Sequence, residues 1–138
     1  MIDELPVSTQ KGVGISLVGG DPEVRHSRQL MLRAERYDVR SYGTNAALLA
    51  DPRSRDYPCI VVDLDPASDV SALLSAMRGS GWRGKAVLIE GDVADSAIRG
   101  TAGRHGDEVL ARPVSQRVLL SAIDASVNRG WSGWNAGR

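Results

Sequence analysis

The residue of this chain best placed to do chemistry is Asp63. It closes the apolar run at 59–62, and four apolar residues followed by an acid predict a buried strand of a parallel sheet with a carboxylate at its carboxyl end. Open α/β sheets carry their chemistry at that edge. The first apolar run ends at Val18, and Gly19 and Gly20 then stand where a metal-binding site of this kind would require acids. The pattern therefore predicts a carboxylate site with an incomplete set of metal ligands.

Strands and helices must alternate along the chain to position that carboxylate. Strands are expected at 13–18, 39–42, 59–63, 86–90 and 108–111, and helices at 22–37, 44–50, 70–77, 92–103 and 114–127. The start of the first helix is marked by Asp21, which precedes a proline and an acid. The polar segment 51–58 is expected to be a loop. Five strands alternating with five helices predict one doubly wound α/β domain, with a parallel sheet covered on both faces.

The length of 138 residues suits a single domain with a sizeable core. We expect a flexible N-terminal arm at 1–12, the folded domain at 13–128 and a C-terminal tail at 129–138. The tail carries Trp131 and Trp134, which suit either a flexible segment or a contact surface.

Composition excludes several classes of function. The formal net charge is zero, which removes the general electrostatic case for binding nucleic acid or an anionic membrane. Cys59 is the only cysteine, so no internal disulfide forms. No apolar stretch approaches the roughly 20 residues of a membrane span, and the first residues do not have the pattern of a signal peptide. A cytoplasmic protein is expected.

Five segments carry a likeness to a known family, namely Ile15–Arg25, Tyr37–Tyr42, Val61–Leu64, Val87–Asp92 and Asp107–Pro113. In order and spacing they resemble the receiver domain of response regulators, most closely its nitrogen-fixation, FixJ-like type. The resemblance implies a flavodoxin-like sheet with the strand order 2-1-3-4-5, and it makes Asp63 the phosphoacceptor by position. It also implies a protein partner, either a histidine kinase or a downstream effector. The contact face it implies, residues 92–127, also suits a homodimer.

The site positions depart from the pattern of that family. Gly19 and Gly20 stand where its acidic pair binds magnesium, and Asp21 comes one position later. The remaining departures are Glu90 in place of a threonine or serine, Arg112 in place of a lysine, and Val109 in place of the aromatic residue that takes part in switching.

These departures change the expected chemistry. Phosphoryl transfer to an aspartate depends on positioning and on charge neutralisation, which a metal ion chiefly supplies. Magnesium takes near-octahedral oxygen ligands, usually one or two carboxylates among them, and Asp63 is the main carboxylate left. The charges of Asp63, Glu90 and Arg112 sum to minus one. We therefore expect weak or absent Mg²⁺ binding, and a metal-free network in which Arg112 pairs with both acids and locks one conformation.

Two functions of different classes remain open. The first is an atypical receiver, neither an enzyme nor dependent on a cofactor, that signals by protein contact without efficient phosphorylation. The second is a working phosphoacceptor, in which a histidine kinase phosphorylates Asp63 with Mg²⁺ and Asp21 or Asp65 replaces a missing ligand. A small α/β enzyme of another kind would need a pocket with acid and base groups, and the sequence indicates none.

Overall fold

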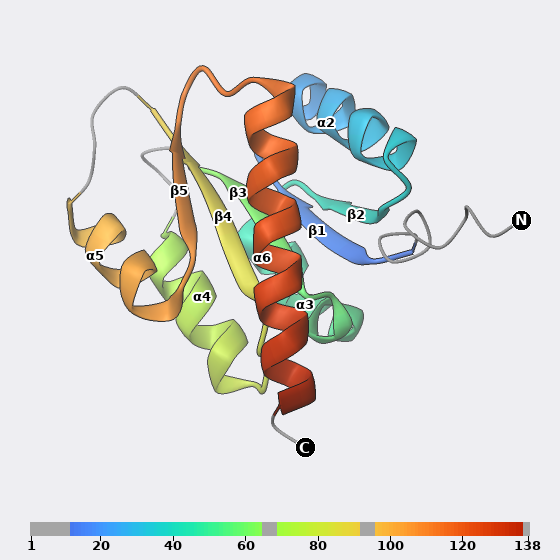
Figure 1. The fold of residues 1–138 in the computed structure, drawn as a ribbon. Coiled ribbons are helices and arrows are strands. Elements are labelled where there is room, and N and C mark those ends of the chain that lie inside the picture. Colours follow the sequence, from blue (N-terminus) through green and yellow to red (C-terminus); the bar gives the residue numbers. More distant parts are fainter. Residues whose placement is uncertain (1–11, 65–68, 92–95, 137–138) are drawn as a thin grey trace, which may run out of the picture.

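The predicted strands pair into one parallel sheet. The computed structural model describes residues 12–64, 69–91 and 96–136 (Figure 1). The strands are β1 (Gly14–Val18), β2 (Asp38–Tyr42), β3 (Cys59–Asp63), β4 (Lys85–Glu90) and β5 (Glu108–Ala111). They lie in the order β2-β1-β3-β4-β5, and every neighbouring pair is parallel. This is the flavodoxin-like order that the resemblance implies.

Helices cover both faces of this sheet, which confirms the predicted doubly wound α/β fold (Figure 1). One face packs against α2 (Pro22–Ala34) and α6 (Gln116–Ala136). The other packs against α3 (Asn45–Ala50), α4 (Val70–Gly79) and α5 (Ser96–His105).

The alternation of side chains along β3 decides which face its last residue joins. Ile60 and Val62 belong to the apolar cluster under α3 and α4, whereas Cys59 and Val61 belong to the cluster under α2 and α6. Asp63 continues the second of these rows. Its carboxylate is therefore directed to the side of the sheet that α2 covers.

The first helix is shorter than predicted. It ends at Ala34, not at residue 37, because Arg36 has a positive φ of 73° and its amide bonds back to Arg33 O at 2.9 Å. Tyr37 then turns inward and is only 5% exposed.

The segment 51–58, predicted to be a loop, contains the short 3₁₀ helix η1 (Pro52–Asp56). Asp51 caps it by accepting a hydrogen bond from the amide of Arg53 at 3.0 Å, and Pro52 follows at the first helical position. An acid before a proline is the same start signal that marks α2.

The last helix is longer than predicted, so the expected tail is helical as far as Ala136. The described apolar contacts of α6 with the sheet extend to Val127, and the helical backbone continues beyond it. Helix α5 spans 96–105, shifted from the expected 92–103. Residues 1–11 of the expected arm and residues 92–95 lie outside the described residues. Within the described ranges, no helix has the length and apolar character needed to cross a membrane.

Candidate functional site

The carboxyl edge of the sheet brings Gly19 next to Asp63. Strands β1 and β3 are neighbours, with Val18 paired to Val62, so the residues that follow them also lie side by side. A Cβ atom placed on Gly19 would lie 3.4 Å from Asp63 Cβ and 3.5 Å from its Oδ2. Position 19 is therefore where a second carboxylate would approach Asp63, and glycine supplies none. Gly20 follows it and is exposed.

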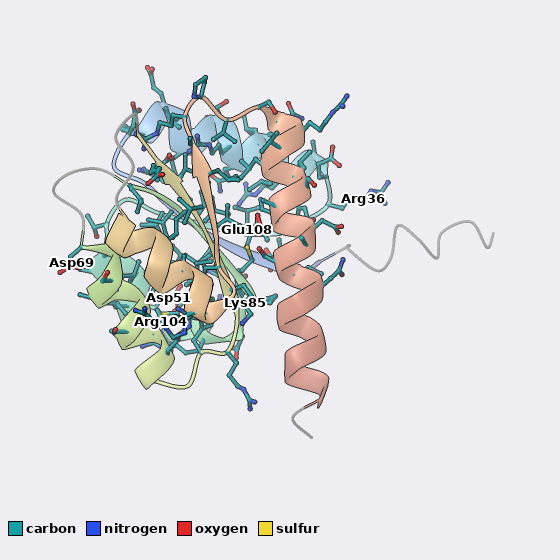
Figure 2. All side chains as sticks on the ribbon, turned by 60° about the vertical axis from the view of Figure 1, so that its left-hand side comes forward. Arg36, Asp51, Asp69, Lys85, Arg104 and Glu108 are labelled. Carbon is teal, nitrogen blue, oxygen red and sulfur yellow. The ribbon has the colours of Figure 1, made fainter. Side chains whose placement is uncertain are left out.

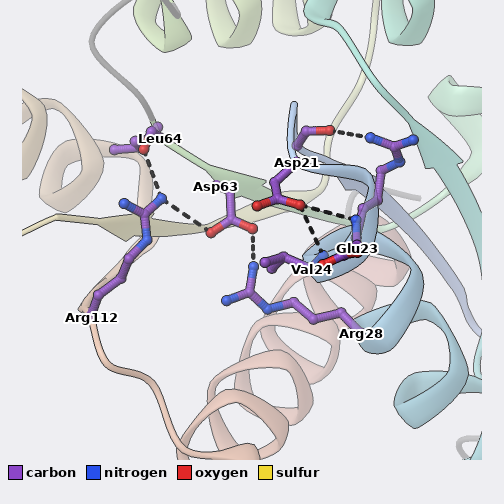
Figure 3. Close-up of polar contacts among 9 residues, drawn as sticks. Asp21, Glu23, Val24, Arg28, Asp63, Leu64 and Arg112 are labelled. Atoms are coloured by element: carbon purple, nitrogen blue, oxygen red, sulfur yellow. Dashed lines mark hydrogen bonds and ion pairs between the residues drawn. The ribbon is translucent and has the colours of Figure 1, made fainter.

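Asp21 uses its carboxylate to begin α2. Its Oδ1 accepts hydrogen bonds from the amides of Glu23 at 3.0 Å and Val24 at 3.3 Å (Figure 3). An acid at this position satisfies amides that would otherwise lack an intrahelical partner. The predicted helix cap is confirmed, and that oxygen is committed to it.

Asp63 is held between two guanidinium groups, which we call the guanidinium clamp (Arg28, Asp63 and Arg112). Arg28, from α2, donates from Nη1 to Asp63 Oδ2, and Arg112, after β5, donates from Nη2 to Oδ1 at 3.3 Å (Figure 3). The side chains of Arg28 and Asp63 are only 17% and 16% exposed, and that of Arg112 is 39% exposed. Each carboxylate oxygen of Asp63 thus has its own cation.

Of the two ion pairs in the predicted network, only one is present. The ion pair between Arg112 and Asp63 is confirmed. Arg112 Nη2 makes its other hydrogen bond to the carbonyl of Leu64 at 2.8 Å, not to the Glu90 side chain. Glu90 is 3% exposed, and the alternation along β4 places it in the row of Leu88, on the α4 side of the sheet. Its contact with Arg112 is through the backbone, from Arg112 N to Glu90 O at 2.9 Å.

The clamp carries an excess of positive charge. Two cations surround one anion, and both burial and the charge of Arg112 lower the pKa of the Arg28 guanidinium. An arginine nevertheless stays protonated at physiological pH. Asp63 therefore screens two like charges from one another as well as pairing with each of them.

A further arginine fixes the loop that leads into the site. Arg25 Nη1 donates to the carbonyl of Gly19 at 2.5 Å, which ties the first turn of α2 to the end of β1. Cations in the first turn of a helix face its positive end, so they need an acceptor of this kind.

Sequence reasoning missed Arg28, although a signal was available. Arg28 follows Val24 by four residues and precedes Met31 by three, so it occupies the apolar stripe of α2. A charged residue in such a stripe requires an anion as its partner. Asp63 is that anion.

The residues at this edge do not fit a magnesium ion. Mg²⁺ needs several oxygen ligands, usually including carboxylates, but both oxygens of Asp63 are bonded to guanidinium groups and Gly19 has no side chain. Among the described residues, no group of three or more His, Cys, Asp or Glu side chains could hold a metal ion. Asp65, the other residue that could replace a missing metal ligand, lies outside the described residues.

Comparison with solved structures identifies the fold class. A CheY-like receiver domain from Methanospirillum hungatei superposes with a TM-score of 0.74 at 18% identity, covering 89% of this chain and 99% of that one. The receiver domain of a putative LuxO repressor from Vibrio parahaemolyticus gives 0.78 at 12% identity, covering 91% and 97%. The FixJ N-terminal domain gives 0.72 at 21% identity, covering 86% and 95%.

The chain thus has the fold of response-regulator receiver domains. The sequence matches no protein-family model and is not significantly similar to any curated protein. At these identities the comparison concerns the fold, and function must be argued from the site.

Proposed function

We propose that this chain is an atypical receiver domain of two-component signalling that acts by protein contact and without efficient phosphorylation of Asp63. The observation that carries the proposal is the guanidinium clamp. Arg28 supplies the positive charge that a metal ion would otherwise bring to this carboxylate. In this role the chain is no enzyme and needs no cofactor.

The clamp opposes phosphorylation in two ways. The carboxylate must be free to attack a phosphoryl group, but both of its oxygens are engaged. The transferred group must also be neutralised and oriented, chiefly by a metal ion, and Gly19 leaves no ligand beside Asp63. Of the two arginines, Arg112 is the better placed to offer hydrogen bonds to a transferred phosphoryl group, since its side chain is the more exposed.

The proposed partner is a protein, either a histidine kinase or an effector, bound at residues 92–127. In the described part of this face β5 forms an edge of the sheet, and Val118 on α6 is 47% exposed. A homodimer through the same face is the alternative arrangement. Sedimentation analysis across a concentration range separates the two, because only self-association depends on the concentration of this chain.

The second candidate function is a working phosphoacceptor. It is favoured by the position of Asp63 at the carboxyl edge of the sheet and by its remaining 16% side-chain exposure. In that case Mg²⁺ and a phosphodonor would have to displace Arg28 from Oδ2.

The deciding experiment is intact-mass analysis after incubation with acetyl phosphate and Mg²⁺. The set comprises the natural chain, Asp63→Asn, and Arg28→Gln, which removes one cation and keeps a hydrogen-bonding side chain. The proposal predicts no added phosphoryl group on the natural chain. An added group on the natural chain that is absent from Asp63→Asn would overturn it and establish the phosphoacceptor.

The Arg28→Gln variant distinguishes two reasons why the natural chain would not be phosphorylated, namely the clamp and the missing metal ligand. If it takes up phosphate while the natural chain does not, the clamp itself blocks the reaction. If neither does, the missing metal ligand is sufficient to block it. Both results support a module that works without phosphorylation, provided that circular dichroism shows each variant to be folded.

A further inference from the structure

A cavity between α4 and α5 lies on the face of the sheet opposite the clamp, and it has a volume of about 190 Å³. Its floor is apolar and consists of Val70 and Leu74 from α4, Leu88 from β4 and Ala102 from α5. Each of these four side chains is at most 5% exposed. Figure 2 shows α5 beside α4 on this face, as Figure 1 does from another side.

From α5, the cavity is lined by Ala102 and His105 among the described side chains. Ala102 reaches the floor with a single methyl group. Gly100 and Gly103 lie on either side of it, and a Cβ atom on either glycine would meet nothing within 4 Å. A longer side chain at position 102 would occupy the volume that alanine leaves.

The mouth of the cavity is polar and carries a fixed guanidinium. Arg78 donates from Nη2 to Asp107 at 2.9 and 3.0 Å, and it stacks 5.1 Å from the centre of the Trp82 ring. Asp107 thus holds the guanidinium by Nη2, and among the described residues no hydrogen bond uses the Nε or Nη1 donors of this lining residue. The exposed hydroxyl of Ser75 and the side chain of His105 complete this rim.

We propose that this cavity binds a small ligand with an apolar ring or chain and a carboxylate head. An apolar cavity of about 150 Å³ accommodates a benzene ring, so the volume here suits a ring and a small head group. A carboxylate head can accept a charge-assisted hydrogen bond from one of the remaining N–H groups of Arg78. The inference concerns a different site from the clamp and does not depend on the proposed function.

A ligand in this position would touch both helices at once. Among the described side chains of α5, only Ala102 is buried, and a ligand in the cavity would add contacts between this helix and α4. Since α5 begins within the face proposed for protein contact, an occupied cavity would alter the surface offered to a partner.

The test is a nuclear magnetic resonance titration of the full ¹⁵N-labelled chain. The probes are benzoate, cyclohexanecarboxylate and hexanoate, with benzyl alcohol as the neutral counterpart of benzoate. We expect saturable shifts at the amides of Leu74, Leu88 and Ala102, with a Kd of roughly 1 mM for at least one acid. Benzyl alcohol should bind several-fold more weakly because it lacks the charged head.

Two variants remove the space in different ways. Ala102→Leu fills the floor, and Ser75→Phe covers the mouth from an exposed position, so it leaves the core intact if the first variant fails to fold. Both should abolish the saturable shifts. Ala46→Leu, on the exposed side of α3, is the matched control and should bind like the natural chain.

Three results would overturn the proposal. The first is the absence of saturable shifts with all three acids. The second is undiminished binding in both Ala102→Leu and Ser75→Phe. The third is equal affinity for benzyl alcohol and benzoate, which would remove the carboxylate from the inference.

Discussion

The two edges of the sheet each hold a partly or fully buried aspartate paired with arginine, and the two sites are built differently. At the amino edge, the side chain of Asp107 is 0% exposed and binds one guanidinium, that of Arg78. It also accepts a hydrogen bond from the amide of Ala86 at 2.8 Å, where β4 begins. At the carboxyl edge, Asp63 is 16% exposed and lies between two guanidinium groups from separate elements.

The difference supports a structural role for Asp107 and the proposal of a site at Asp63. Asp107 pairs with one arginine, and the backbone hydrogen bond that it also accepts joins two segments of the sheet. Asp63 is outnumbered by its cations, and the neighbouring position 19 has no side chain at all.

The largest effect should come from Asp107→Ala. This change leaves Arg78 half-buried without its anion and Ala86 N without an acceptor, and breaking such a buried pair costs about 3–5 kcal/mol. Urea denaturation followed by circular dichroism measures the loss. Asp56→Asn, at an exposed position of η1, is the control and should change the free energy of unfolding by less than about 0.5 kcal/mol. Similar values for the two variants would contradict a structural role for Asp107.

A smaller loss is expected from Asp63→Asn, about 1–3 kcal/mol, because the clamp is only partly buried. The loss arises from two guanidinium groups that then face one another without an anion. Arg28→Gln should cost less, since it leaves Asp63 and Arg112 as a neutral pair.

Combining Asp63→Asn with Arg28→Gln tests whether the two guanidinium groups repel one another. In Asp63→Asn with Arg28→Gln, the repulsion between Arg28 and Arg112 is gone, so the double variant should be more stable than Asp63→Asn alone. Urea denaturation of Asp63→Asn and of the double variant measures that difference. A double variant no more stable than Asp63→Asn would show that the two cations do not repel one another in the folded state.

Metal binding should appear when a carboxylate replaces Gly19 and Arg28 is removed. In Gly19→Asp with Arg28→Ala, two carboxylates face Arg112 alone, and we expect Mg²⁺ to bind with a Kd of roughly 1 mM. The single variant Gly19→Asp should not bind it, because Arg28 neutralises the added charge. Calorimetric titration tests both. Gly19→Asn with Arg28→Ala is the control of equal size, and Mg²⁺ binding by that variant would show that the carboxylate is not the cause.

The smallest effects concern two glycines away from both aspartates. Gly103→Ala, in α5, should stabilise the chain by about 0.5–1 kcal/mol, because alanine has the higher helix propensity and a Cβ there meets nothing. Gly81→Ala also meets nothing, but it lies at a φ of +102° and should destabilise by about 1 kcal/mol. Thermal unfolding measures both. Shifts of the same sign would mean that backbone conformation does not decide the outcome.

The sheet could be predicted from the sequence because parallel strands buried on both faces are continuous apolar runs. The runs at Cys59–Asp63 and Glu108–Ala111 match the observed strands residue for residue. The end of α6 could not be predicted in the same way. The clear apolar periodicity runs only to Val127, and the helical backbone continues to Ala136.

The candidate site was predictable where it depended on strand positions. Gly19 follows β1 and lies beside Asp63, the last residue of the adjacent strand β3, whereas Arg112 follows β5 and reaches Asp63 across the end of β4. Arg28 was not predicted, since a residue in the middle of a helix reaches the edge only through the angle at which the helix packs. Glu90 was assigned to the network by its sequence position, but the alternation along β4 turns it to the other face.

Arg28 also determines how the site responds to its surroundings. A dissolved cation occupies a carboxylate in proportion to its concentration, whereas a cation tethered on α2 binds intramolecularly, at an effective concentration in the millimolar range. The supply of that cation is fixed by the covalent chain and does not depend on the concentration of free Mg²⁺. Under the proposed function, the carboxyl edge would therefore keep the same charge state when chelators or nucleotides change the supply of free metal.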